Sequence, residues 1–466
     1  MSFITRIILI LIFALPSVSK GDIFHYANVL AGDRAMGLGG AFTAISDDAS
    51  GVIYNPAGLA FALSNDISAS ANAFYMKETK YKKTLGNNDF RELSDGSVAP
   101  FFGGMQKLDH FVDGLSFGVG IQTVDSELKN QNDLFKNVVF QSGKYNEGTE
   151  ASPELEACYS QKEDQVISQL ARTVNARSST QSFGAAVGYR LTGSLAIGAG
   201  LSYVKIDELV QEFQGNDINK GDCSGGISNP REVTSSVRQN IRTHLKAGAI
   251  VPILGAQFSM NSGFSFGLSL KPGVMMDETY EVSTERTYFT KLRSDNSLFS
   301  FTDKDTVPAL SSNTEFSKPI GAMPLEMRMG MAWFANQRLL VSMDVSHFTE
   351  SKDGNKNIGG VFDREAVTNL AVGAEYYVSP SYPLRLGFFT NNDAREEVDK
   401  VTGNSRDHID YKGISAFITK VTPNDQVAVG TIIQVGQGQA QKVGGTTVQE
   451  VEAQSAVLAF SVSNNF

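Results

Sequence analysis

Four basic side chains have the type and position best suited to binding an anion. Arg328 lies in PLEMRMGMAWF and Arg385 in PLRLGFFTN, each on the face opposite an alternating apolar stripe. We expect His244 and Lys246, in RTHLKAGAIV, to share that face and to point into an enclosed interior. A guanidinium can bind a carboxylate through two parallel hydrogen bonds. These residues therefore either pair with acids on the same face, or hold a neighbouring segment, or bind the carboxylate of a ligand.

The other reactive groups form no recognisable catalytic, metal or nucleotide site. The five histidines lack metal-ligand spacing, and neither a nucleophile elbow nor a P-loop occurs. GLGGAF at 37–42 is a poor dinucleotide fingerprint, because no apolar strand precedes it and no βαβ unit follows. A net charge of −10 argues against nucleic-acid binding. We expect a protein that is not an enzyme and uses no cofactor, although spacing alone leaves open a Ser/His/Asp set assembled by the fold.

The elements that position these residues are segments of about ten residues with alternating hydrophobicity. Leu195, Ile197, Ala199, Leu201 and Tyr203 fall on one side of SLAIGAGLSYV, with small residues opposite. The pattern predicts about 14 strands, near 65–76, 97–106, 113–124, 178–190, 194–210, 235–252, 263–284, 315–334, 338–349, 365–378, 382–391, 409–421, 425–436 and 453–466. A soluble sandwich shows the same alternation, so the connections must discriminate.

The connections alternate between short turns and long polar loops. Short ones include 192–193 and 335–337, and long ones include 125–177 and 211–234. This pattern is typical of an outer-membrane barrel. We therefore predict an all-β fold: a transmembrane antiparallel β-barrel of about 14 strands. Because the count is even, the barrel should begin and end on the short-turn, periplasmic side. The final strand ends in Phe466 and resembles the signal that the bacterial barrel assembly machinery recognises.

The chain ends and cysteines fit an exported protein. Residues 1–19 resemble a secretory signal peptide, with Arg6 before a short apolar run and a cut expected after Ser19. We divide the rest into an N-terminal hatch at 20–62 and a barrel at 63–466. Cys158 and Cys223 both fall in long loops, where they form either a disulfide or two free thiols.

The stretch RAMGLGGAFTAISDDASGVIYNPAGLA at 34–60 suits neither a strand nor a well-capped helix. Its glycines permit close backbone approach, and Asp47, Asp48 and Asn55 offer side-chain acceptors to backbone N–H groups. Side chains cannot fill a lumen of about 14 strands, so a plug at this position is expected. The stretch resembles the hatch of the FadL/TodX family of outer-membrane hydrophobic-compound transporters, with Asn55, Pro56 and Ala57 matching the family's Asn-Pro-Ala motif.

The resemblance implies passive uptake of hydrophobic compounds, most often long-chain fatty acids. Ligand would displace the hatch and leave sideways through a kinked strand into the membrane lipid. Gly118 and Gly120 in GLSFGVGIQT either mark that lateral gate or make room for the hatch. We expect a monomer in the bacterial outer membrane. A related PorV-type barrel, which serves a secretion system as a scaffold or shuttle, also has a Gly-rich opening with Asn-Pro-Ala and is the alternative.

Overall fold

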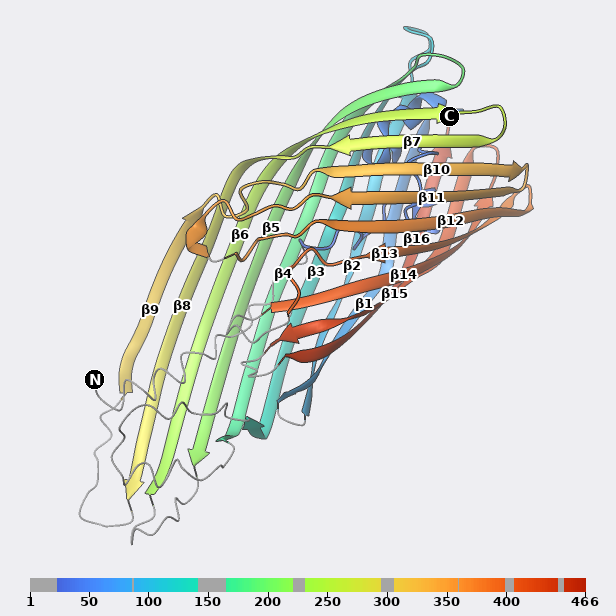
Figure 1. Ribbon diagram of the computed structural model, residues 1–466. Helices are drawn as coiled ribbons and strands as arrows, with labels where there is room; N and C mark the ends of the chain where they lie inside the picture. Colours follow the sequence, from blue (N-terminus) through green and yellow to red (C-terminus); the bar gives the residue numbers. More distant parts are fainter. Residues whose placement is uncertain are drawn as a thin grey trace.

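The computed structural model describes residues 23–85, 88–140, 165–220, 231–294, 306–358, 360–398, 406–442 and 448–466. Most of these residues lie in strands, and the helices are short (Figure 1). The elements are α2 (Asp33–Gly37), α3 (Gly51–Tyr54), η1 (Pro56–Phe61), β1 (Asp66–Leu85), β2 (Asn88–Lys107), β3 (Leu115–Phe140), β4 (Gln165–Arg190), β5 (Leu195–Lys220), β6 (Arg231–Ser259), β7 (Phe264–Lys271), β8 (Val274–Ser294), β9 (Thr306–Ser317), β10 (Glu326–Asn336), β11 (Leu339–Phe348), η2 (Lys356–Ile358), β12 (Val367–Ser379), β13 (Tyr382–Asn391), β14 (Arg406–Val421), β15 (Asp425–Gln441) and β16 (Gln449–Asn465). No helix in these ranges is long and apolar enough to cross a membrane.

The strands close into an antiparallel ring. β1 pairs with β2 on one side and with β16 on the other, and the remaining neighbours follow chain order. β6 pairs first with β8 and then, towards its end, with β7, because Pro272 and Gly273 interrupt one continuous path. Proline lacks the N–H that a ladder needs. β9 and β10 are likewise two parts of one path, so the ring has 14 strands and the predicted fold is confirmed.

Side chains of the short-turn half alternate between an apolar outer face and a mixed inner face. Leu201, Trp333 and Phe460 are exposed on the outer wall, whereas Ser202 and Arg385 are buried inside. An outer belt of this kind is the surface that a membrane-spanning barrel presents to lipid. The barrel also begins and ends at the short-turn end, where Asp66 is the partner of Asn465 and the Phe466 N–H donates to the carbonyl of Asn65.

Several strands continue well beyond the segments that alternation predicted. β3 and β4 occupy much of the stretch 125–177, and together with β5, β6, β8 and β9 they form a long extension on one side of the ring (Figure 1). The extension reverses the pattern: Leu245, a member of β6, is buried inside, and Lys246 is exposed outside. An outer face that meets water must be polar, so apolar side chains turn inward. In the extension the apolar side chains therefore no longer lie on the outer face. We recognised strands in the sequence by an apolar outer face, so we predicted loops for these residues.

Candidate functional site

The N-terminal segment (residues 23–62) lies inside the ring and touches strands on all sides of it. The Ser415 hydroxyl of β14 donates to the carbonyl of Gly37 at 3.0 Å, and the Ser265 hydroxyl of β7 donates to that of Ala44 at 2.7 Å. Val52 packs in one apolar cluster with residues of β2 and β4. Such contacts with distant strands are possible only from within the lumen. The segment therefore occupies the place expected for a hatch, and its displacement remains a proposal.

Glycines of the wall let the backbone of the segment lie directly against the strands. A Cβ on Gly198 would lie 2.4 Å from Ala57 N, and one on Gly267 would lie 2.1 Å from the Thr43 oxygen. A Cβ on Gly387 would lie 2.2 Å from Gly39 N. These glycines belong to strands on different sides of the ring. We call the surface that they provide for the segment the seat.

Asn55 joins the segment to itself and to the wall. It is fully buried, and its Oδ1 accepts from Ala57 N at 3.2 Å, so that it caps η1 with Pro56 at the first position. Its Nδ2 donates to the carbonyls of Thr43 at 2.8 Å and Ala256 at 3.0 Å. All polar atoms of this amide are thus used, which gives the Asn-Pro-Ala motif a physical role as an anchor.

The two adjacent aspartates have different surroundings. Asp47 forms an ion pair with Arg34 at 2.9 Å. Asp48 accepts from the N–H and hydroxyl of Ser50 at 2.8 and 2.6 Å. Burial, followed by the nearby charge of Asp66, raises the pKa of Asp48 to about 7 from an ordinary value of 3.8. Asp48 therefore titrates near neutral pH.

Arg385 points into the lumen and belongs to a buried ionic network. Its Nε donates to Glu375 at 2.7 Å and its Nη1 to Asp33 at 3.0 Å. Arg34 donates to the other Glu375 oxygen at 3.1 Å. Sequence reasoning missed Arg34, although it is the sole Lys or Arg between Lys20 and Lys77. The network fastens the segment to β12 and β13 and engages both Nε and Nη1 of Arg385.

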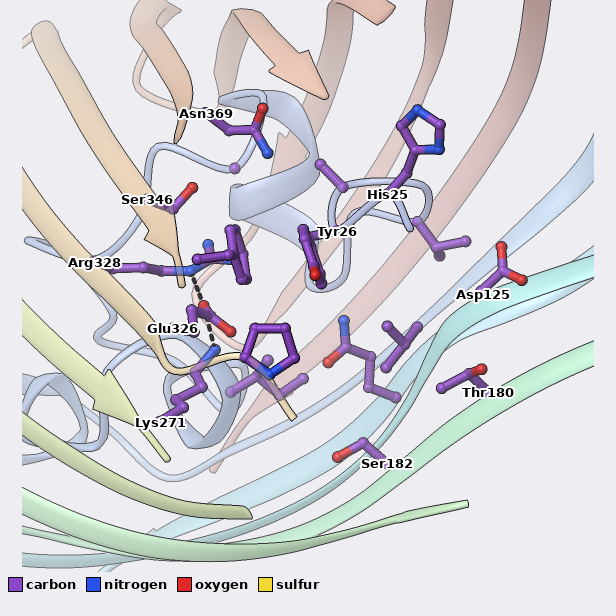
Figure 2. Close-up of a pocket in the computed structure, with 18 of the residues that line it drawn as sticks. His25, Tyr26, Asp125, Thr180, Ser182, Lys271, Glu326, Arg328, Ser346 and Asn369 are labelled. Atoms are coloured by element: carbon purple, nitrogen blue, oxygen red, sulfur yellow. Dashed lines mark hydrogen bonds and ion pairs between the residues drawn. The ribbon is translucent and has the colours of Figure 1, made fainter. Parts of the chain in front are cut away.

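A cavity of about 220 Å³ lies between the segment and the wall, on the long-loop side of the seat. Figure 2 shows Arg328 at its edge, where Arg328 and Lys271 both bond to Glu326. The Lys271 to Glu326 distance is 2.8 Å. Much of the remaining lining is apolar: Ile23, Val204, Ile206, Val251, Ile253, Met275, Ile320 and Met323. Arg328 thus lies at the edge of a largely apolar chamber, and Glu326 is its ion-pair partner.

His244 and Lys246 do not point into the lumen, contrary to the sequence expectation. The inward positions of this part of β6 are Thr243, Leu245 and Ala247, which are buried. His244 instead lies 3.3 Å from Asp207 on the opposite face. The error has the same cause as the missed strand extension, because here the polar face is the outer one.

Gly118 and Gly120 lie in β3 with different neighbours. A Cβ on Gly118 would lie 2.7 Å from Val52 of the segment, and one on Gly120 would lie 2.9 Å from the Phe101 ring. Among the described residues, β2–β3 pairing runs from Lys107–Ser116 to Phe101–Gln122 and next resumes at Asp95–Leu128. Pro100 lies in this interval and cannot donate to the ladder. Gly118 therefore makes room for the segment, and the interrupted pairing leaves the lateral gate as a proposal.

The predicted disulfide between Cys158 and Cys223 falls on residues that the structure does not describe.

No protein-family model and no curated protein sequence matches the chain. Its structure resembles a Pseudomonas aeruginosa FadL homologue, with a TM-score of 0.52 and 12% identity over 97% of this chain and 99% of that one. The toluene transporter TodX of P. putida has a TM-score of 0.54 and 13% identity over 94% and 98% of the two chains. The toluene transporter TbuX of Ralstonia pickettii has a TM-score of 0.51 and 14% identity over 94% and 99%. The chain therefore has the FadL/TodX barrel fold that its N-terminal stretch led us to expect.

Proposed function

We propose that this protein is a bacterial outer-membrane transporter that takes up hydrophobic compounds passively, with long-chain fatty acids as its main ligands. One observation carries the proposal. One part of the interior of the extension, formed mainly by β5, β6 and β8, is an apolar cluster that continues into the lining of the chamber, whereas β2 to β5 also bury the ion-paired Glu92, Lys129, Arg172 and Glu212. A water-filled pore would have a polar interior at this level. Burial is worth about 0.8 kcal/mol per CH₂, so a chain of about 16 carbons gains on the order of 12 kcal/mol.

The route follows from the positions of the segment and of β3. Ligand enters from the extension and occupies the chamber, and the N-terminal segment then shifts to open a way out. The interrupted β2–β3 pairing lies beside an apolar groove on the outer wall, lined by Phe102, Val119 and Leu201. An exit there would deliver an apolar molecule straight into lipid. No cofactor enters this scheme, because partition alone drives the movement.

Two substitutions on β6 test the function. Val251→Asp places a carboxylate in the apolar chamber, and Lys246→Asp places the same group on the outer face of the same strand. We expect cells with the first variant to lose uptake of labelled palmitate and cells with the second to retain it. Heat-modifiable migration on gels shows that both barrels fold. Equal uptake by both variants would contradict the proposal.

The lipids that copurify with the protein provide an independent test. Mass spectrometry of an extract from the purified barrel should reveal fatty acids or other small hydrophobic compounds. An extract holding membrane phospholipid alone, together with copurifying exported proteins, would instead favour the scaffold or shuttle function.

A further inference from the structure

Arg364 is a buried cation that forms no ion pair with the carboxylates of the described residues. It precedes β12, and its backbone is held by reciprocal hydrogen bonds with Ser351 at 2.8 and 2.9 Å. The side chain is only 4% exposed and lines the chamber. Its Nε has no hydrogen-bond partner, and none of the described carboxylates lies within ion-pair distance of it. Burial without an opposite charge is costly and lowers the pKa of Arg364.

Two other arginines near the chamber form ion pairs, unlike Arg364. Arg395 lies over the same Phe24 ring as Arg364, at 5.0 against 5.8 Å, but it binds both Asp393 and Asp407. Arg328 on the other side of the chamber is bound to Glu326. The acids that act on Arg364, Asp353 and Glu278, do so only from beyond ion-pair range. A buried arginine without an ion pair would be stabilised by a bound anion.

Tyr26 provides a second unused group in the same chamber. Its ring stacks on Phe348 with centroids 3.8 Å apart, which fixes its direction. Its hydroxyl is buried and has no hydrogen-bond partner. Figure 2 shows the ring in the middle of the chamber, beside the Lys271–Glu326–Arg328 group. Tyr26 and Arg364 both line this chamber.

We infer that Arg364 and the Tyr26 hydroxyl form the head-group site for the carboxylate of an anionic amphiphile. A carboxylate accepts hydrogen bonds from both a guanidinium and a phenol. The attached chain would lie along Ile23, Met275 and Met323, the apolar residues of the same chamber. The inference rests on the proposed function and adds the residues that distinguish charged from neutral ligands.

The test compares two labelled ligands with equal chains, palmitate and 1-hexadecanol, in equilibrium binding to the purified full-length barrel. The variants are Arg364→Gln and Tyr26→Phe, and the second keeps the stacking on Phe348. Arg338→Gln, at the exposed short turn after β10, is the matched control for loss of one positive charge. Hydrogen bonds to charged groups predict that Arg364→Gln weakens palmitate binding about 10- to 100-fold. Hexadecanol binding should not change, and Tyr26→Phe should show a smaller loss of the same kind.

The outcomes separate the two proposals. Selective loss of palmitate in both site variants, with the control unchanged, supports the head-group site. If the wild type binds palmitate and hexadecanol equally, or if Arg364→Gln weakens both equally, the site is refuted while hydrophobic uptake stands. If the wild type binds neither ligand, both the function and the site are refuted.

Discussion

Replacing Gly198 by alanine should loosen the N-terminal segment without harming the strand that carries the change. Gly198 lies in β5 and faces the Asn-Pro-Ala turn. Glycine weakens a strand, so alanine is no burden to β5 itself. The effect must therefore come from contact with the segment.

The distances set the size of the effect. The new Cβ would lie 2.4 Å from both Ala57 N and the Pro56 carbonyl carbon, whereas ordinary contact begins at 3.4 Å. The turn must move away from the wall by about 1 Å, because both contacted atoms belong to the backbone and cannot rotate aside. The 3.0 Å hydrogen bond from Asn55 to Ala256 would then be lost. Overpacking and one lost hydrogen bond together cost about 2–4 kcal/mol.

Hydrogen exchange of residues 51–61 in the purified barrel measures this seating directly. A loss of about 2–4 kcal/mol makes local opening about 30- to 1000-fold more frequent. The strand amides should keep their protection. Conductance in planar bilayers should rise as the plug loosens, which links the structural change to function.

Gly193→Ala is the matched control, because a Cβ there meets nothing within 4 Å. It makes the same chemical change two residues before β5 begins. If residues 51–61 exchange equally fast in the Gly198 and Gly193 variants, the segment does not rest on the wall as the structure indicates. The assignment of the glycines as a seat would then be refuted.

Three further substitutions test the contacts that hold the segment. Arg385→Gln should lower the free energy of unfolding by about 3–5 kcal/mol, because it removes the ion pair of buried Asp33 and leaves Glu375 with Arg34 alone; Lys352→Gln, which breaks an exposed pair, should cost less than about 1 kcal/mol. Urea titrations that give similar small losses would contradict the buried network. Asp48, with a pKa of about 7, holds a proton in the seated state between about pH 4 and 7 that the unseated state lacks, so seating should weaken as pH rises from about 4 to 7 and change little above that. Hydrogen exchange should show a steeper slope in the wild type than in Asp48→Asn, where Asp66 still accepts a hydrogen bond from Ala49 N of the segment, and an equal slope in the variant would disprove the assignment. Asn55→Ala removes the cap, costs about 0.5–2 kcal/mol locally, and should leave assembly intact while raising the leak of small solutes. Deletion of residues 34–60 should raise the leak further, and unchanged conductance and uptake would overturn the hatch assignment.

Much of the architecture was already present in the sequence. A period of two, with Leu201 and Tyr203 on one side and small residues on the other, predicts strands wherever one face meets lipid. Alternating short and long connections predict a closed ring, and the number of strands followed from counting them. Local spacing also located the small-residue stretch at 34–60 and its Asn-Pro-Ala turn. These features depend on neighbours in the chain, so they can be recognised without the fold.

Tertiary structure decided what the charged residues do. Lys246 faces outward because the outer face of β6 is polar at that position along the barrel. The neighbouring sequence does not show at which position along the barrel a residue lies. Arg385 is occupied by Glu375 and Asp33, the latter more than 300 positions away, while the buried Nε of Arg364 has no hydrogen-bond partner among the described residues. Closure of the ring around the N-terminal segment decides which basic side chains form ion pairs and which remain able to bind a ligand. These ion pairs depend on distances across the lumen between residues far apart in the sequence, so no local pattern of residues predicts them.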